Sequence, residues 1–217
     1  MPVSRTRFKA LKDVFSSDRS FQLHARIARL FVLYEDLRIE MLGIVEKDLG
    51  RLDGRDIRYR VNYFLRRSIG TWWEYAEAVR LLNALPDFVY IKTRFGPSGL
   101  KKWNRAVRFF AKYETFIKGI RNDIGGHFGT KAAEYAVAHL RPDAIGKFEL
   151  IGYDSHHVEM FPAFVGELAA TAFHRQLSKS NTADRYTRMF RTIKAGWRHG
   201  TYCTQLIADR YLWDRFG

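Results

Sequence analysis

The chain has 217 residues, enough to bury a substantial core, and its 47% hydrophobic and 28% charged residues exclude an intrinsically disordered protein. Lys and Arg number 37 against 23 Asp and Glu, so the net charge is +14 and the sequence pI is about 10.0. Such a surplus attracts polyanions, nucleic acid most often and an anionic membrane surface next.

Cysteine usage and hydropathy indicate a cytoplasmic protein. Cys203 is the single cysteine, so no intramolecular disulfide can form, and residues 1–15 contain no apolar core of signal-peptide length. No run of the sequence approaches the roughly 18 apolar residues of a membrane span. We therefore expect a soluble, cytoplasmic protein with no membrane partner, although the charge leaves peripheral attachment open.

The first predicted helix covers residues 21–49 and ends before Gly50. Its main apolar stripe repeats every three or four positions and consists of Leu23, Ile27, Leu30, Tyr34, Leu37, Met41 and Ile44. Other apolar residues lie off this stripe, namely Phe31, Val32, Leu33 and Ile39. A second burial surface would explain them, and a dimer contact is one candidate.

The second predicted helix starts near Asp56, ends before Pro86 and runs antiparallel to the first. Arginines gather toward its start, at Arg55, Arg58, Arg60, Arg66 and Arg67. They form either a solvated face or a surface that follows an RNA backbone, and the sequence favours neither. Lys118, further along the chain, is another candidate for RNA binding.

The rest of the chain returns to helix after two interruptions. Residues 86–99 contain Pro97 and two glycines around a short apolar run, which predicts an ordered loop or a brief strand. Residues 100–120 and 131–140 follow as helices, and residues 143–162 predict a short strand or hairpin. Two further helices are expected around residues 164–173 and 186–197, the last one continuing past Gly200 toward Leu212.

The fold class predicted from these elements is all-α. We expect an antiparallel helical bundle, with additional C-terminal helices and one short hairpin. Residues 1–142 form the helical core with an N-terminal arm, and residues 143–217 form a C-terminal helical extension packed on the same domain.

The segment 120–129, IRNDIGGHFG, carries the candidate site. On an unbroken helix Arg121 and His127 would lie about 120° apart in azimuth and about 9 Å apart along the axis. Gly125 and Gly126 permit a tight turn that brings both side chains toward one point. The same residues also suit a capped helix end, so a structural and an anion-binding or catalytic interpretation both remain.

Two polar residues follow the arginine. Asn122 or Asp123 can cap backbone amides that the turn frees, or can orient the guanidinium of Arg121.

An Arg followed by a polar residue, with His after a short spacer in a helical bundle, resembles the motif of the HEPN superfamily of ribonucleases. Here it reads Arg121-Asn122, then His127 after five intervening residues from the arginine. The resemblance covers roughly residues 20–140. It implies a homodimer with the Arg-His pairs in a cleft across the interface, metal-independent cleavage of RNA, and a role in toxin–antitoxin modules, abortive infection or other phage defence. Partners implied are RNA, with tRNA a candidate, and an antitoxin or activator protein.

The chemistry of these residue types fits RNA cleavage. An imidazole that titrates near neutrality can act as general base or acid, and a guanidinium offers a planar donor fork to phosphate oxygens. One chain has one such pair, so a two-histidine mechanism needs the partner's His127. We expect Arg121 and His127 to be catalytic, Asn122 to orient them, and the products to end in a 2′,3′-cyclic phosphate.

No cofactor and no metal are expected. His156 and His157 are adjacent in an extended segment and would point to opposite sides, which does not suit a shared metal. Cys203 lacks the setting of a nucleophile and is expected to be buried. The alternative function is a non-catalytic basic helical module that binds RNA or protein, with a degenerate motif.

Overall fold

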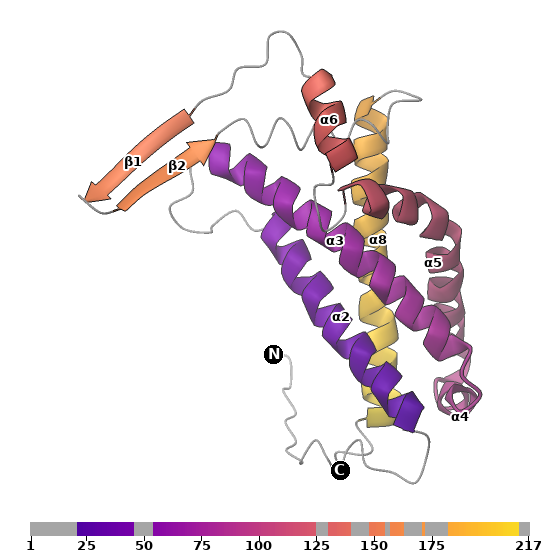
Figure 1. Cartoon of the computed structure of the whole chain (residues 1–217). Coiled ribbons are helices and arrows are strands. Elements are labelled where there is room, and N and C mark those ends of the chain that lie inside the picture. The colour runs from indigo at the N-terminus through magenta and orange to yellow at the C-terminus, as the bar shows by residue number, and fades with distance from the viewer. Residues whose placement is uncertain are drawn as a thin grey trace. The chain divides into compact units, whose positions relative to one another are not determined.

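The computed structural model describes residues 21–45, 54–124, 130–139, 148–154, 157–162, 171 and 182–212. The helices are α2 (Phe21–Val45), α3 (Gly54–Asn83), α4 (Phe88–Thr93), α5 (Gly96–Ile124), α6 (Thr130–Ala138) and α8 (Thr182–Ile207), followed by the π-helical turn η1 (Ala208–Leu212) (Figure 1). The strands are β1 (Phe148–Asp154) and β2 (His157–Pro162). An all-α helical bundle with one short hairpin is therefore confirmed.

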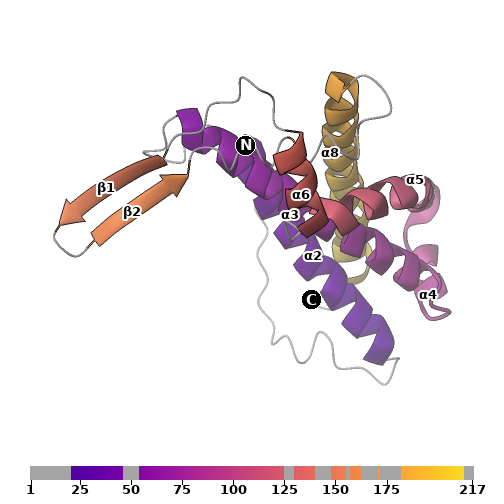
Figure 2. The same ribbon diagram turned by 45° about the horizontal axis from the view of Figure 1, so that its top comes forward.

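The hairpin lies within the segment that the sequence predicted for it. Its two strands pair antiparallel, with Phe148 opposite Pro162 and Ile151 opposite Glu159 (Figure 2). The register shifts between Gly152 and Asp154, next to the connection.

The chain divides into two compact units that share the long helices. Unit 1 comprises Met1–Leu37, Trp72–Glu114 and Lys194–Gly217, and unit 2 comprises Arg38–Thr71 and Thr115–Ile193. Each unit is thus built from segments that are far apart in the sequence. Residue 143, where the sequence predicts that the C-terminal extension begins, falls inside unit 2, and that boundary stays a prediction.

Unit 1 is held together by large aromatic side chains. Trp72, Tyr75 and Trp103 are completely buried. The Phe110 ring lies 5.2 Å from that of Trp72 and 5.6 Å from that of Tyr75, centroid to centroid, so it joins α5 to α3. Burying a ring of this size stabilises the fold by roughly 1.5–3 kcal/mol, and the edge-on and tilted arrangements add to it.

Helix α8 packs against α3 in unit 1 through two glycines. A Cβ atom on Gly196 would lie 1.7 Å from Nε1 of Trp72, so only glycine permits this approach. One turn further on, the Tyr75 hydroxyl donates to the carbonyl oxygen of Gly200 at 3.0 Å and lies 3.0 Å from Oγ1 of Thr204. Burial raises the pKa of Tyr75 well above its ordinary value, which keeps this donor protonated.

Helix α4 corrects the prediction of a loop or brief strand at residues 86–99. Phe88, Ile91 and Phe95 are buried, whereas Val89 and Tyr90 are exposed, which is the three-four spacing of a helical face. Pro97 favours a break in the sequence, yet it lies in the first turn of α5, where proline is compatible with a helix. The chain then reverses at Gly96, whose φ of 66° lies in the left-handed region that glycine adopts readily.

The predicted apolar faces of the other helices are confirmed where their side chains are described. On α2 every residue of the main stripe is buried except the half-buried Tyr34. On the predicted face of α5, Val107 and Tyr113 are half-buried and the other four residues are buried, namely Trp103, Phe110, Ile117 and Ile120. Off the main stripe of α2, Leu33 is buried, whereas Val32 and Ile39 are 61% and 54% exposed.

Unit 2 has its own close contact between α2 and α3. A Cβ atom on Gly43 would lie 2.5 Å from the ring of Phe64, so the two backbones approach closely there. Met41, Leu65 and Ile69 are buried on the same pair of helices. Because this side of α2 packs against α3, the opposite side is exposed, and Ile39 lies there.

Candidate functional site

Arg121 and Asn122 lie in the last turn of α5, in unit 2. Ile117 and Ile120 are 0% and 2% exposed, so the core fixes the rotation of this turn. Arg121 follows directly and is half-buried, whereas Asn122 is exposed. A guanidinium at the border between core and solvent can present its donor fork to an anion while its stem remains packed.

The rest of the motif lies outside the described residues. Helix α5 is described to Ile124 and α6 from Thr130, and Gly125, Gly126 and His127 fall between them. Asp123 belongs to α5, and its side chain is likewise outside the description. The approach of His127 to Arg121 therefore stays a prediction.

The arginines at the start of α3 have a partly internal role. Arg60 is 8% exposed, so it does not belong to a solvated face. Arg67 is exposed, and its Nε lies 3.7 Å from Oε1 of Glu40. Glu40 is itself buried and accepts a hydrogen bond of 2.8 Å from Oγ1 of Thr71. This buried polar contact between α2 and α3 was not foreseen from the sequence.

The other residues predicted to bind RNA are spread over two helices. Arg66 on α3 is half-buried and Lys118 on α5 is exposed. The side chains of Arg55 and Arg58 lie outside the described residues. Exposure alone is therefore compatible with RNA binding at Lys118 and Arg67.

A second cluster, missed by the sequence reasoning, lies on α5 and α8 in unit 1. We call it the α5–α8 face, and it consists of Lys102, Arg105, Phe109, Arg198, His199 and Tyr202. The Phe109 and His199 rings are 4.5 Å apart, centroid to centroid, at 36°. The Lys102 Nζ lies 5.4 Å from the centre of the Tyr202 ring. Basic and aromatic side chains thus alternate across two adjacent helices.

The charge on these two helix segments is of one sign. Residues 96–113 of α5 contain five basic residues and no acidic one, and residues 194–207 of α8 contain two basic residues and no acidic one. All seven are exposed, namely Lys101, Lys102, Arg105, Arg108, Lys112, Lys194 and Arg198. Burial and, secondarily, the Arg105 guanidinium lower the pKa of His199 below its ordinary value of 6.5. Both causes favour the neutral imidazole over the charged one.

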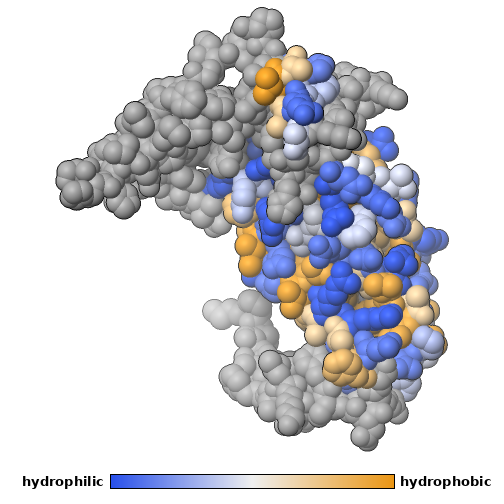
Figure 3. Space-filling model, viewed as in Figure 1, coloured by the Kyte–Doolittle hydropathy of each residue, from blue (hydrophilic) through white to orange (hydrophobic). Residues whose placement is uncertain are grey.

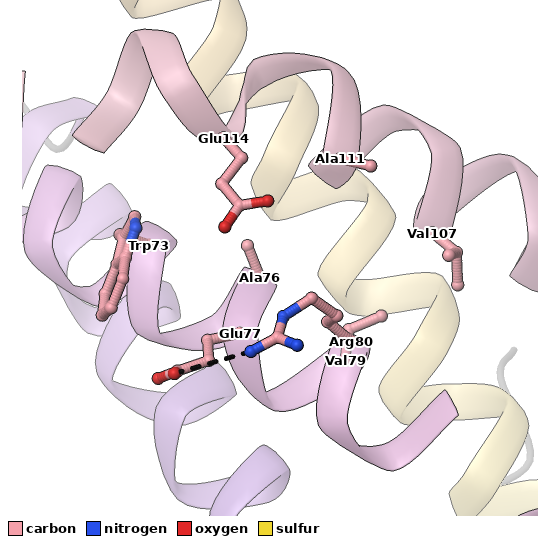
Figure 4. Close-up of a pocket in the computed structure, with 8 residues that line it drawn as sticks. All are labelled: Trp73, Ala76, Glu77, Val79, Arg80, Val107, Ala111 and Glu114. Atoms are coloured by element: carbon pink, nitrogen blue, oxygen red, sulfur yellow. Dashed lines mark ion pairs between the residues drawn. The ribbon is translucent and has the colours of Figure 1, made fainter. Parts of the chain in front are cut away.

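A shallow pocket lies between α3 and α5, also in unit 1. Its walls are Trp73, Ala76, Glu77, Val79, Arg80, Val107, Ala111 and Glu114 (Figure 4). Its volume is about 40 Å³, room for a few water molecules at roughly 10–15 Å³ each. The Glu77 carboxylate forms two ion pairs, one of 3.9 Å from Oε1 to Nη2 of Arg80 and one of 3.5 Å from Oε2 to Nη2 of Arg29. A nucleotide does not fit this pocket, and none of the predicted site residues lines it.

Within the described ranges no three His, Cys, Asp or Glu residues come together in a way that would hold a metal ion. None of the described helices combines the length and apolar character needed to cross a bilayer. The face shown in Figure 3 is largely hydrophilic where its residues are described, with single apolar residues among them.

Comparison with known proteins adds no family to this description. The chain matches no protein-family model, no curated protein and no solved structure.

Proposed function

We propose that the protein is a metal-independent endoribonuclease whose catalytic residues are Arg121 and His127, with Asn122 orienting them. The proposal includes a homodimer that places both copies of the pair in one cleft. It follows the resemblance of the Arg-Asn and His spacing to the HEPN ribonucleases.

The observation that carries the proposal is the position of Arg121-Asn122 on α5. Ile117 and Ile120 anchor the last described turn, and the polar pair follows at the border of the core. A short stretch of chain, with Gly125 and Gly126, separates this turn from α6. We expect this stretch to return His127 toward Arg121.

The reaction needs three things from these side chains. The 2′-hydroxyl of the substrate must lose a proton, and a neutral imidazole can accept it. The phosphorane formed by attack of the 2′-oxygen carries additional negative charge, which the guanidinium stabilises through its fixed fork of donors. The leaving 5′-oxygen must gain a proton, which the imidazolium of the partner's His127 supplies. The products are a 2′,3′-cyclic phosphate and a 5′-hydroxyl.

The deciding experiment is cleavage of total tRNA and ribosomal RNA in EDTA by the wild type, His127→Ala and Arg121→Lys. We expect cleavage by the wild type only, with a loss of at least about 100-fold in each variant, the usual size of a general acid–base contribution. Arg121→Lys keeps the positive charge and removes the planar pair of guanidinium donors. A loss of cleavage in this variant would therefore indicate bidentate contact between Arg121 and the phosphate. Mass spectrometry should find products whose mass is lower by one water than that of products with a linear 3′-phosphate, because the phosphate is cyclic.

The matched control is His139→Ala. His139 is an exposed histidine directly after α6. Its ring stacks on that of Tyr135, with the two centroids 3.9 Å apart. This variant should cut RNA as the wild type does. Circular dichroism must show that all variants remain helical, and equal cleavage by wild type and His127→Ala would overturn the proposal.

A second candidate is a basic helical module that binds RNA without cutting it. The observation in its favour is the α5–α8 face, whose exposed basic residues and exposed Tyr202 can bind RNA without catalysis. Folded wild-type protein that binds the RNA and cleaves none of it, alone or with a cognate activator, would favour this function.

A further inference from the structure

The α5–α8 face has the two components of a surface for single-stranded nucleic acid. Cations along a groove or ridge follow the phosphates, and exposed aromatic rings stack on successive bases. Lys102, Arg105 and Arg198 supply the cations. Tyr202, 47% exposed, and the half-buried Phe109–His199 pair supply the rings.

Helix geometry places the cations and the rings of this face on the same side of each helix. Lys102, Arg105 and Phe109 are spaced by three and four positions, so they share one side of α5. His199 and Tyr202 are spaced by three and share one side of α8. Along α5, Lys102 and Phe109 are about 10 Å apart, so the two positions can contact different nucleotides of one strand.

Internal packing accounts for only part of the face, since the Phe109 ring also lies 6.2 Å from that of Trp72 and 5.6 Å from that of Phe110, centroid to centroid. The core of unit 1 already buries Trp103, Ala106 and Phe110 on the inner side of α5. None of the seven basic residues on these segments forms an ion pair with an acid in the described part of the chain, and Lys102 instead lies over a tyrosine ring. Cations and rings held at the surface in this way are available to a ligand.

The composition of the face distinguishes among polyanions. A membrane surface would require a wide apolar side, with residues such as Leu, Phe and Trp opposite the charges. Duplex nucleic acid keeps its bases stacked on one another and offers mainly phosphates. The exposed Tyr202 ring and the half-buried Phe109–His199 pair next to cations favour unstacked bases, and the partner is then single-stranded.

We propose that the α5–α8 face binds single-stranded RNA, with bases stacking on Tyr202 and on the Phe109–His199 pair and phosphates bound by Lys102, Arg105 and Arg198. The inference rests on RNA as the ligand of the proposed function, and it does not require cleavage. It assigns substrate binding in unit 1 to residues other than the Arg121 motif.

The test is a binding titration with a fluorescent single-stranded RNA of about 16 nucleotides, a length within the range of such sites. The RNA is 2′-O-methylated, so it has no 2′-hydroxyl and cannot be cut by the proposed reaction. Tyr202→Ala should weaken binding by about 5- to 150-fold, the effect of losing one stacked base. Tyr202→Phe keeps the ring and should bind as the wild type does.

The matched control is Tyr90→Ala. Tyr90 is 50% exposed on α4 and lies under Arg94 at 5.8 Å, so it repeats the ring and cation of Tyr202 at another place in unit 1. Its loss should leave binding unchanged. Equal weakening by Tyr90→Ala and Tyr202→Ala would overturn the assignment to this face.

The salt dependence tests the phosphate contacts separately. For a single strand, the loss of one phosphate contact should reduce the slope of the log binding constant against the log salt concentration by about 0.7 in magnitude. Lys102→Ala, Arg105→Ala and Arg198→Ala should each show this decrease. Unchanged slopes would overturn the proposal, and so would equal affinity for duplex RNA or Tyr202-dependent binding to anionic lipid vesicles.

Failure of this inference differs from failure of the proposed function. If His127→Ala abolishes cleavage while Tyr202→Ala binds normally, the nuclease stands and the face is not its RNA site. If Tyr202→Ala loses binding and no RNA is cut by the wild type, the face stands and the nuclease does not.

Discussion

His199 shows how one side chain responds to its surroundings. It lies half-buried between Phe109 and Phe110, and burial is the main cause of its lowered pKa, with Arg105 the second. The folded chain therefore takes up a proton at His199 less readily than the unfolded chain does. Its contribution to stability is present above the ordinary pKa of 6.5 and decreases as the pH falls below that value.

Substitution of Arg105 tests this account at the residue scale. We expect Arg105→Gln to raise the pKa of His199 without returning it to 6.5, because burial, the larger cause, remains. The measurement is an NMR titration of the His199 ring protons in wild type and variant. A pKa that does not change would exclude Arg105 as a cause. A wild-type pKa at or above 6.5 would contradict the burial of the ring.

At the scale of elements, the packing of α8 on α3 depends on Gly196. Any larger residue would place its Cβ inside the Trp72 indole, which is buried and has no room to move aside. We expect Gly196→Ala to lower the free energy of unfolding by about 1–3 kcal/mol, the usual result of overpacking. At this chain length that corresponds to roughly 2–4 °C in Tm for each kcal/mol.

Gly70→Ala is the matched control for this measurement. Gly70 also lies inside a long helix, α3, and a Cβ there would meet nothing within 4 Å. Alanine should stabilise that helix by about 0.5–1 kcal/mol. Thermal melts followed by circular dichroism should therefore move in opposite directions. A Gly196→Ala variant as stable as the wild type would show that α8 does not pack on Trp72.

At the scale of the whole molecule, α2 has a row of exposed apolar residues among the parts of the chain that the structure describes. Ile39, Leu42 and Val45 are spaced by three on unit 2 and are 54%, 41% and 52% exposed. Surface residues of this kind in a row are typical of a contact with another chain. Together with the proposed shared cleft, they make this row our expected dimer contact.

Ile39→Glu should separate such a dimer. A carboxylate in an apolar interface loses its hydration, so we expect the dimer Kd to rise at least about tenfold and cleavage to fall with it. Light scattering coupled to gel filtration should find twice 25.4 kDa for the wild type and a single chain for the variant. Gln22→Glu adds the same charge at another exposed position of α2 and should remain dimeric. A monomeric wild type that still cuts RNA would contradict the shared cleft.

The helices and the hairpin were accessible from the sequence because their signals are local. A residue's neighbours at three and four positions decide which side of a helix is apolar, and the stripe from Leu23 to Ile44 is buried as expected. Helix α4 was missed although Phe88, Ile91 and Phe95 follow the same spacing, since a short helix between prolines resembles a loop.

The motif at Arg121 was also a local signal, and the sequence placed its first two residues on the end of a helix. What the sequence could not determine is which distant segments meet. Arg60 is buried, and Glu40 accepts a hydrogen bond from Thr71. Trp72 lies against Gly196, which is more than 100 residues away in the sequence.

The α5–α8 face exists only because two segments far apart in the sequence pack side by side. Taken alone, Lys102 and Arg105 are ordinary exposed charges of a helix, and His199 and Tyr202 are single residues of another. Local periodicity determined the helices and their inner sides by itself. The tertiary structure decided the composition of the surfaces, because packing of whole helices sets which outer residues become neighbours.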